Sequence, residues 1–361
     1  MFGKKKQLVQ IFKRTISILF FFILSGCGVN GELEEIEGHV FLGETQGTTY
    51  QIILAEEKAN FTNAEIKSIL AGFDLSLSTY KDSSIITKLN DSESTVELID
   101  STGYFKRCYQ ESELVYKASN GAFDPSVFPL IDGWGFMKNL ETPLSKTTVD
   151  SILQFVSFEN EKYHSLQFKG DTIQSIKKDK RFKLDFNAIA QGLSIDVLTE
   201  FISSRGHKNF YVEIGGEMRV VGKNRIGENW KIGIDVPKDN AVPDGVRQLE
   251  NVLSISNKSI ATSGNYRNFY VKDGKKYAHT LDPRTGYPVD HSLLSATVIS
   301  DNCSTSDAYA TVFMVIGLEE SKKFVNNHPE LNLEVYFLFD DHNKIGRYFN
   351  KSVEAYLDKS K

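Results

Sequence analysis

The sequence is poor in cysteine, and this limits the structural classes to which the protein can belong. Three cysteines occur in 361 residues, and no two of them have C-x-x-C spacing. The sequence therefore excludes a disulfide-rich scaffold and gives no support for a zinc site built from cysteine pairs. Cys108 and Cys303 are expected to be buried thiols, and a single disulfide between them is the alternative.

The sequence also lacks an excess of positive charge and the short motifs of several common enzyme classes. Its formal net charge is −5, and removal of residues 1–26, which carry five positive charges and no negative ones, changes this to −10. An acidic surface argues against nucleic-acid binding. The motifs G-x-x-x-x-G-K-[ST], H-E-x-x-H and G-x-S-x-G are absent, and G-x-G-x-x-G occurs only at residues 26–31, where no preceding strand is expected, so Rossmann, P-loop, zincin and hydrolase-elbow functions lack support.

The N-terminal residues have the pattern of a bacterial lipoprotein signal peptide. Lysine and arginine precede the apolar run 16–24, which is too short to span a bilayer and is followed by Ser25-Gly26-Cys27. We expect lipid attachment at Cys27, and an ordinary cleaved signal peptide is the alternative. A lipidated chain lies outside the cytoplasm on a membrane. The periplasmic side of the inner membrane is the expected location, although Gly28 does not itself select a membrane.

The remaining chain is predicted to form one domain of the α+β class. Apolar residues recur with helical spacing in 66–77, 114–118 and 194–204, and short glycine turns join several strand-like runs, as in antiparallel sheets. We predict a signal peptide (1–26), a lipidated tether (27–40) and a single domain (41–357). The predicted strands are 50–54, 210–214, 217–221, 230–236, 253–255, 294–299 and 333–339.

Three polar positions are candidates for a functional site. Asp307 and Thr311 are four residues apart in an alanine-rich stretch that predicts a buried helix beginning at Asp307, so their oxygens project from one face. This pair suits either a helix cap or a site for a hard cation such as Mg²⁺. Asp185, expected at the end of a strand before a helix, offers a second acidic group or another cap.

His279 precedes the turn Asp282-Pro283-Arg284-Thr285-Gly286 and is either structural or an acid–base group. The stretch 262–265, expected just after a strand, suits either a phosphate-binding loop or a plain turn.

The order of these motifs resembles the ApbE family of FAD:protein FMN transferases over nearly the whole predicted domain. The most specific piece is the H-x-x-D-P-x-T-G stretch at 279–286. The other matching segments are Gly47-Thr48-Thr49-Tyr50, Ser78-Thr79-Tyr80, Gly121-Ala122-Phe123-Asp124-Pro125, Leu184 to Gly192, Gly215-Gly216-Glu217, Ala261-Thr262-Ser263-Gly264 and Ser306 to Thr311.

The resemblance implies an ApbE-like, T-fold-related domain and a Mg²⁺-dependent flavinyltransferase. Such an enzyme splits FAD at its pyrophosphate, joins FMN by a phosphoester bond to a threonine or serine of a partner flavoprotein, and releases AMP. The acceptor would carry the motif Asp-x-x-Ser/Thr-Gly-Ala-Thr/Ser. Two alternatives are a Mg²⁺-dependent FAD pyrophosphatase, with water as acceptor, and a lipoprotein that binds FAD without cutting it.

By the same resemblance, the side chains of Asp307 and Thr311 and the carbonyl of Ala188 bind Mg²⁺, and His279 is the catalytic base. Asp282 either shares the base role or holds the turn. Two departures from the family pattern stand out. Ala310 occupies a position where some relatives have a second acidic residue, and Gln46 replaces a common methionine. The FAD-contact positions implied are Gln46, Tyr80, Ala122, Phe123, Asp124, Asp185, Gln191 and Leu281.

Overall fold

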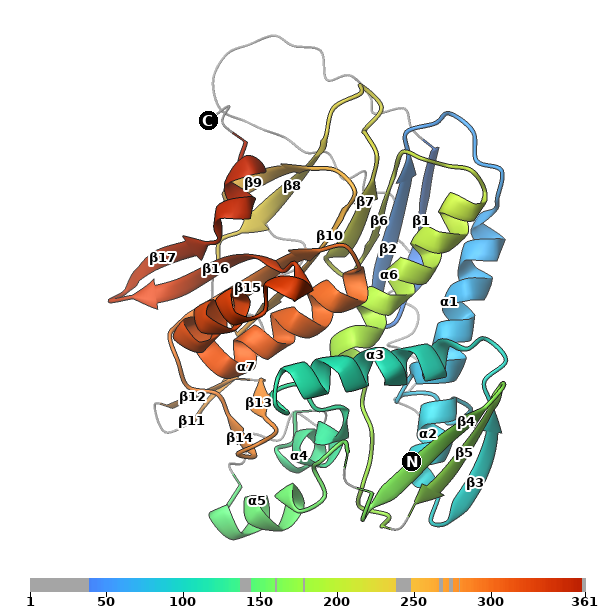
Figure 1. Cartoon of the computed structure of the whole chain (residues 1–361), viewed down its shortest axis with the longest axis vertical. Helices are drawn as coiled ribbons and strands as arrows, with labels where there is room; N and C mark the ends of the chain where they lie inside the picture. The colour runs from blue at the N-terminus through green and yellow to red at the C-terminus, as the bar shows by residue number, and fades with distance from the viewer. Residues whose placement is uncertain are drawn as a thin grey trace, which may run out of the picture. The chain divides into compact units, whose positions relative to one another are not determined.

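An eight-stranded antiparallel sheet forms the centre of the described structure (Figure 1). The computed structural model describes residues 39–136, 144–159, 161–177, 179–237, 248–265, 280–358 and, for the backbone only, 269–272 and 275–278. The strands, in spatial order, are β1 (His39–Thr45), β2 (Thr48–Leu54), β6 (Phe210–Ile214), β7 (Glu217–Val221), β10 (Lys258–Gly264), β15 (Leu293–Ser300), β16 (Glu334–Asp341) and β17 (Lys344–Phe349).

Smaller sheets and helices surround this sheet. A three-stranded antiparallel sheet has the order β3 (Thr95–Ile99), β5 (Thr172–Lys177), β4 (His164–Lys169). Three hairpins are β8 (Trp230–Asp235) with β9 (Leu249–Ile255), β11 (Phe269–Lys272) with β12 (Lys275–Ala278), and β13 (Leu281–Asp282) with β14 (Tyr287–Pro288). The helices are α1 (Asn63–Leu77), α2 (Ile85–Asp91), α3 (Tyr104–Ala118), α4 (Phe128–Gly133), α5 (Lys146–Leu153), α6 (Asn187–Ser204) and α7 (Cys303–Asn327), with short 3₁₀ turns η1 (Pro125–Val127), η2 (Pro329–Leu331) and η3 (Lys351–Ala355).

Both faces of the eight-stranded sheet are covered. Successive side chains of a strand point to opposite faces, and on β15 Val298 belongs to the core shared with α7, while Ile299 belongs to the core shared with β8, β9 and η3. Figure 1 shows α7 lying across one face of this sheet. A central strand covered on both sides needs apolar residues throughout, which explains the almost continuous burial of β15.

Helices α6 and α7 approach each other closely at their N-terminal ends. A side chain at Gly192 of α6 would overlap the carbonyl of Cys303 and lie 2.8 Å from the Ser304 Cα, so only glycine permits this approach. Asp196, one turn further along α6, accepts hydrogen bonds from the backbone N–H groups of Cys303 at 2.7 Å and Ser304 at 2.8 Å. A side chain of α6 thus caps the start of α7, which has no side-chain cap of its own.

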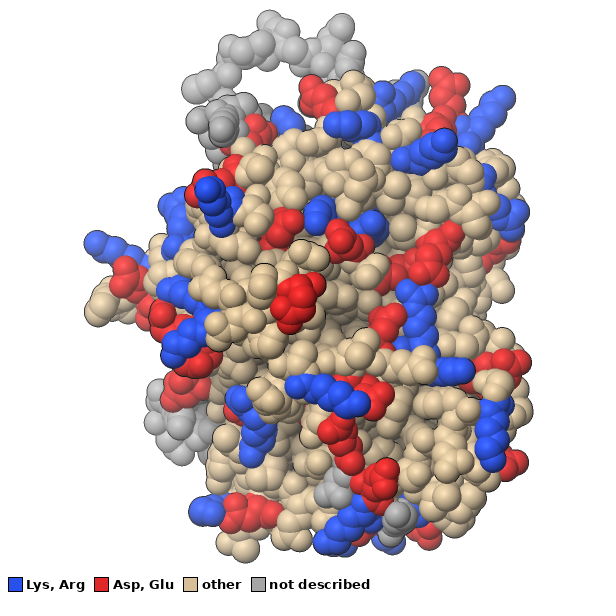
Figure 2. Space-filling view, in the orientation of Figure 1, with Lys and Arg blue, Asp and Glu red and all other residues tan. Residues whose placement is uncertain are grey.

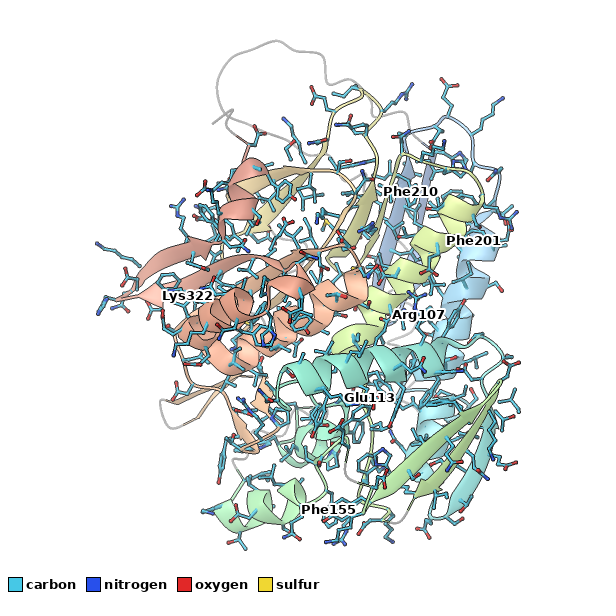
Figure 3. All side chains as sticks on the ribbon, viewed as in Figure 1. Arg107, Glu113, Phe155, Phe201, Phe210 and Lys322 are labelled. Atoms are coloured by element: carbon cyan, nitrogen blue, oxygen red, sulfur yellow. The ribbon has the colours of Figure 1, made fainter. Side chains whose placement is uncertain are left out.

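An ion pair links α6 to α3. Arg107 of α3 lies 2.9 Å from Glu111 on its own helix and 2.9 Å from a carboxylate oxygen of Glu200 on α6. Figure 3 shows Arg107 between these two helices. Because these side chains are partly exposed, the ion pair adds little to the free energy of unfolding and mainly orients α3 relative to α6.

Helix α7 is interrupted at Gly317, which has the left-handed φ of 76°. The ring of His291 packs against this glycine, and its Nε2 atom lies 2.8 Å from the carbonyl oxygen of Met314. His291 therefore packs against the break between the two parts of α7.

The structure confirms the α+β class and most predicted elements, and it corrects several boundaries. Helix α7 begins at Cys303, four residues before the predicted start at Asp307, and α6 begins at Asn187 instead of residue 194. Thr262, Ser263 and Gly264 lie within β10 and do not follow it. Asp185 does not end a strand, because residues 182–186 have no regular secondary structure. Leu114, predicted to lie on an apolar helix face, is 68% exposed.

Cys108 and Cys303 are free, buried thiols, as favoured from the sequence. Within the described ranges, none of the helices combines the length and apolarity that a membrane span requires. The face seen in Figure 2 carries lysine and arginine interspersed with aspartate and glutamate, without a continuous basic area. Cys27, the predicted signal peptide (1–26) and residues 27–38 of the predicted tether (27–40) lie outside the described residues, and the predicted boundaries stay predictions.

We predict that Asp196→Ala destabilises the protein by about 2 kcal/mol, because two buried N–H groups at the start of α7 lose their acceptor. Urea unfolding followed by circular dichroism measures this change. The control is Asp150→Ala on α5, which removes an exposed ion pair with Lys146 and should cost less than about 0.5 kcal/mol. Equal effects of the two substitutions would contradict the capping role of Asp196.

Candidate active site where helices α6 and α7 meet

Sequence segments far apart in the chain meet beside the first turns of α6. The backbone N–H of Asp185 donates to the carbonyl oxygen of Pro125 at 2.7 Å, which joins the 121–125 segment to the start of α6. Gln191 Nε2 donates to the carbonyl oxygen of Ile214 at 2.6 Å, which brings the β6–β7 turn to the same helix. Most of the predicted site residues that the structure describes therefore lie on connected elements.

Asp307 is a buried acid inside α7, and it does not cap this helix. It is the fifth residue of α7 and is 4% exposed. Its Oδ2 atom accepts a hydrogen bond at 3.1 Å from the backbone N–H of Gly192. The capping interpretation of Asp307 is therefore wrong, and its carboxylate instead faces the first turns of α6.

This hydrogen bond also affects the carbonyl of Ala188. In a regular helix the N–H of Gly192 would donate to the carbonyl oxygen of Ala188, four residues earlier. Because the same N–H also donates to Asp307, and a carbonyl oxygen has two lone pairs, the Ala188 carbonyl keeps a lone pair for another partner. Thr311, one turn after Asp307, is half-buried, and its hydroxyl lies 3.4 Å from Ser263 Oγ on β10.

Glu217 at the start of β7 is part of this site, although no role was predicted for it. Its carboxyl group interacts with that of Asp307. Burial raises the pKa of Glu217 well above its usual range, and the Asp307 carboxylate raises it further. Burial also raises the pKa of Asp307 to about 7, against the lowering effect of the bonds from Gly192 and Glu217.

The sequence contained one signal for Glu217. It directly follows Gly215-Gly216, both of which have positive φ and permit a tight turn. That turn segment matched the family pattern, but neither periodicity nor spacing indicates that β7 would begin opposite Asp307.

Asp124 and Asp185 are buried acids held by local hydrogen bonds. Asp124 accepts from the backbone N–H of Ser126 at 2.7 Å, its hydroxyl at 2.6 Å, and the backbone N–H of Phe158 at 3.3 Å. Asp185 accepts from the backbone N–H of Asn187 at 2.6 Å, at the start of α6. Asp185 therefore satisfies one backbone N–H in the first turn of α6, as the capping alternative predicted. Burial raises the pKa of each carboxyl to about 6.

Gln46 lies at the tip of the β1–β2 hairpin. Gln46 and Gly47 both have positive φ, as a two-residue hairpin turn requires. The backbone N–H of Gly215 donates to the carbonyl oxygen of Thr49 at 3.1 Å, so this hairpin end lies beside the β6–β7 turn.

The turn at 282–286 is held by its own side chains. Both carboxylate oxygens of Asp282 bond Arg284, at 2.9 and 2.8 Å from its Nε and Nη2 atoms. Trp134 Nε1 donates to the carbonyl oxygen of Gly286 at 2.8 Å, which anchors the turn on α4. Asp282 therefore holds the turn. His279 lies outside the described residues, and its role stays a prediction.

The other predicted FAD-contact residues differ in exposure. Leu281 is buried and packs with Leu130 and Val149 near α4 and α5. Ala122 and Phe123 are buried in the core, whereas Tyr80 is 76% exposed.

The site supplies oxygen atoms of several kinds. Within the described ranges, no three His, Cys, Asp or Glu side chains gather in a way that could hold a metal by themselves. A cation here would therefore need neutral oxygens beside the carboxyl groups. The Ala188 carbonyl and the Thr311 hydroxyl are of that kind, and an all-oxygen set suits Mg²⁺ more than a softer metal.

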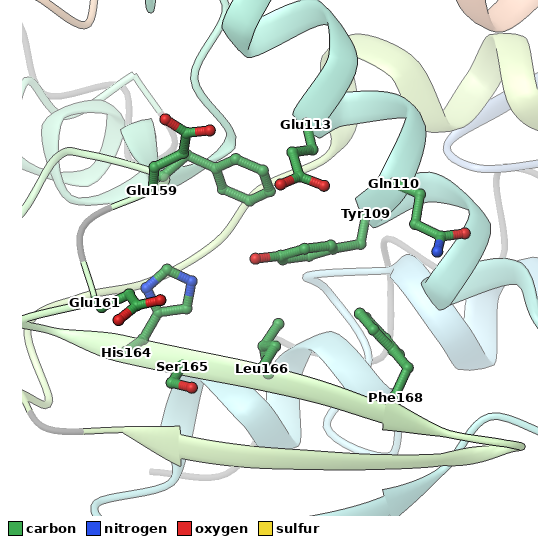
Figure 4. Close-up of a pocket in the computed structure, with 10 residues that line it drawn as sticks. Tyr109, Gln110, Glu113, Glu159, Glu161, His164, Ser165, Leu166 and Phe168 are labelled. Atoms are coloured by element: carbon green, nitrogen blue, oxygen red, sulfur yellow. The ribbon is translucent and has the colours of Figure 1, made fainter.

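A separate pocket of about 490 Å³ lies between α3 and β4 (Figure 4). Tyr109, Phe158 and Phe168 contribute aromatic walls, and Glu113, Glu159 and Glu161 contribute acidic groups. Phe158 connects this pocket to the site, because its backbone N–H binds Asp124.

We predict that the metal-free protein is more stable at pH 5 than at pH 7.5. The pKa values of Asp124 and Asp185 rise from 3.8 in the unfolded chain to about 6 on folding. The stability due to these protonated carboxyls is complete below about pH 4 and is lost as the pH rises through about 6, at a cost near 3 kcal/mol per group. Thermal unfolding in EDTA measures this trend.

The variant Asp185→Asn should flatten this pH dependence, because it retains an oxygen acceptor for the Asn187 N–H but does not ionise. A melting temperature that rises between pH 5 and pH 7.5 in the wild type would contradict the assignment.

Comparison with known proteins finds similar proteins over most of the chain. The model of the ApbE family matches residues 46–337. A protein named FAD:protein FMN transferase from Haemophilus influenzae is 29% identical over 319 residues, which cover 87% of this chain and 89% of the relative. One of the same name from Vibrio cholerae is 29% identical over 350 residues, covering 95% and 98%.

Solved structures of similar proteins have the same fold as this chain. The flavin transferase ApbE from Vibrio cholerae superposes with a TM-score of 0.75 at 28% identity, covering 89% of this chain and 99% of that one. The apo form of the flavinyl transferase ApbE from Pseudomonas stutzeri gives a TM-score of 0.76 at 25% identity, covering 90% and 98%. With a family match over most of its length and these shared folds, the chain belongs to the ApbE family.

Proposed function

We propose that this protein is a Mg²⁺-dependent FAD:protein FMN transferase. It cleaves the pyrophosphate of FAD, attaches FMN to a threonine or serine hydroxyl of a partner flavoprotein, and releases AMP. The observation that carries this proposal is the buried Asp307 carboxyl facing the Ala188 and Gly192 end of α6. The names of the relatives, FAD:protein FMN transferase, supply the reaction class.

The described residues fit a Mg²⁺ ion. Asp307, Thr311 and the Ala188 carbonyl provide a carboxylate, a hydroxyl and a peptide oxygen beside one another, and these are ligands that Mg²⁺ accepts. When bound, the ion neutralises negative charge on the pyrophosphate and holds its oxygens in place. The Gly192 N–H orients the Asp307 carboxylate by its bond to Oδ2.

The remaining residues bind the substrate and move one proton. The acceptor hydroxyl oxygen forms a bond to the phosphorus on the FMN side, while the bond from that phosphorus to the bridging oxygen breaks and AMP leaves with this oxygen. We assign removal of the hydroxyl proton to His279, because both carboxylate oxygens of Asp282 are occupied by Arg284. The positions assigned to FAD binding are Gln46, Tyr80, Ala122, Phe123, Asp124, Asp185, Gln191 and Leu281.

The proposed enzyme works at a membrane surface. The apolar run 16–24 followed by Cys27 supports a lipid anchor such as palmitate at Cys27, with the domain on the periplasmic side of the inner membrane. In this location the enzyme meets flavoprotein subunits that carry the acceptor motif.

We predict that Asp307→Asn lowers the rate of FMN transfer at least about 100-fold, because one metal ligand loses its charge. Mass spectrometry of an acceptor protein incubated with FAD, Mg²⁺ and the full-length enzyme in detergent detects the covalently added FMN. Asp341→Asn on the exposed end of β16 is the control and should retain the wild-type rate. Release of free FMN and AMP without an adduct would replace transfer with hydrolysis, and intact bound FAD would exclude both.

We also predict that Cys27→Ser releases the protein from the membrane fraction, since it removes the thiol that carries the lipid. Labelling with radioactive palmitate and fractionation of cells measure the result. Cys108→Ala, at a buried thiol, should retain the label. A Cys27→Ser protein that stays labelled and membrane-bound would show that the anchor lies elsewhere.

A further inference from the structure

Between Asp307 and Thr311, helix α7 offers the proposed Mg²⁺ site no second acidic side chain. Ala310 is fully buried and supplies no side-chain oxygen. Asp307 is therefore the acidic residue that α7 contributes to this site. A compensating ligand would have to come from another element that packs against the same turn of α7.

Glu217 on β7 has the required position. Its carboxyl group is buried and interacts with the Asp307 carboxyl. The Glu217 Oε2 atom is enclosed, yet it receives no hydrogen bond from any N–H or O–H group of the described residues. A buried carboxyl oxygen without a donor is costly unless another partner satisfies it.

The backbone around Glu217 is fixed on two sides. Ile214 pairs with Glu217 across the β6–β7 hairpin, and its carbonyl oxygen accepts from Gln191 Nε2 at 2.6 Å. Gly215, with a φ of 62°, packs directly against the Gln191 amide, and a side chain at this position would overlap it. The same helix that carries Ala188 and Gly192 thus holds the turn that presents Glu217.

We infer that Glu217 is a direct ligand of the cation and supplies a carboxylate oxygen from β7 in place of the one that Ala310 does not offer. Glu217 and Asp307 then bind the cation from a strand and a helix, with the Thr311 hydroxyl and the Ala188 carbonyl as neutral ligands. This inference rests on the proposed function for the existence of the Mg²⁺ site. The competing role for Glu217 is to hold Asp307 in place through a hydrogen bond, without touching the cation.

The substitution Glu217→Gln separates these two roles. Glutamine is nearly isosteric and can still donate a hydrogen bond to Asp307, but it carries no charge and is a much poorer ligand for a hard cation. The probe is Mn²⁺, which replaces Mg²⁺ and is detected by electron paramagnetic resonance of the free ion, with the full-length protein in detergent and without FAD. We expect Glu217→Gln to weaken Mn²⁺ binding at least about tenfold, equal to about 1.4 kcal/mol.

Water-proton relaxation gives a second measurement, because it counts the waters bound to Mn²⁺. Loss of a protein ligand should add about one water in Glu217→Gln, since the vacated coordination position fills with solvent. Glu217→Asp, which keeps a carboxylate, should retain more affinity than Glu217→Gln. The matched control is Glu213→Gln on the neighbouring strand, where the side chain bonds the Gly216 N–H at 2.5 Å and the amide oxygen can do the same.

Wild-type affinity and an unchanged water count in Glu217→Gln would overturn the inference and leave Glu217 as a positioning residue. An equal loss of affinity in Glu213→Gln would also overturn it, because a general charge effect would then explain the result. If Mn²⁺ binding depends on Glu217 but no FMN is transferred to an acceptor, the inference stands and the proposed function fails. If Asp307→Asn also leaves Mn²⁺ binding unchanged, the metal site and this inference both fail.

Discussion

The contact between the first turns of α6 and α7 is the constraint on which the site depends. Two helices can approach this closely only where one of them has no side chain, and Gly192 provides that position. The approach places the unpaired N–H groups of α7 against α6, where Asp196 accepts two of them. The same packing directs the Gly192 N–H toward Asp307, so one contact builds the fold and orients the acid.

This arrangement removes several acidic groups from water, and their desolvation costs free energy. Asp124, Asp185, Asp196 and Asp307 are each at most 7% exposed. Each has hydrogen-bond donors, but desolvation outweighs them and raises the pKa of each carboxyl. Such groups do not stabilise the empty domain at neutral pH, and their clustering beside one helix end is typical of a functional site.

Sequence patterns predicted the class of the fold and much of the site, for identifiable reasons. Strands β6 and β7 were predicted with their observed bounds, because glycine turns limit alternating apolar runs there. The three-stranded sheet was not predicted, since strands such as β3 and β4 are short and largely exposed and give no clear periodicity. The start of α7 was misplaced because its cap comes from Asp196, more than a hundred residues away in the chain.

The role of Glu217 shows a further limit of sequence reasoning. The pair Asp307 and Thr311, proposed as ligands, is visible in the sequence because helical spacing relates the two residues. Glu217 and Asp307, in contrast, come from a strand and a helix separated by 90 positions. Their proximity follows from the order of strands in the sheet and from the crossing of α7 over it, and neither is encoded in a local pattern.

The break at Gly317 divides α7 into two parts that can change independently of each other. Before the break, α7 carries Asp307 and Thr311 in a buried setting, while after it the chain bears exposed charged residues such as Glu319, Glu320 and Lys323. Because the left-handed glycine ends the continuous run of helical hydrogen bonds, a shift or bend in the outer segment does not rotate the inner one about its axis. Changes of the charged surface of the outer segment can therefore leave the orientation of the two inner oxygen-bearing side chains unaltered.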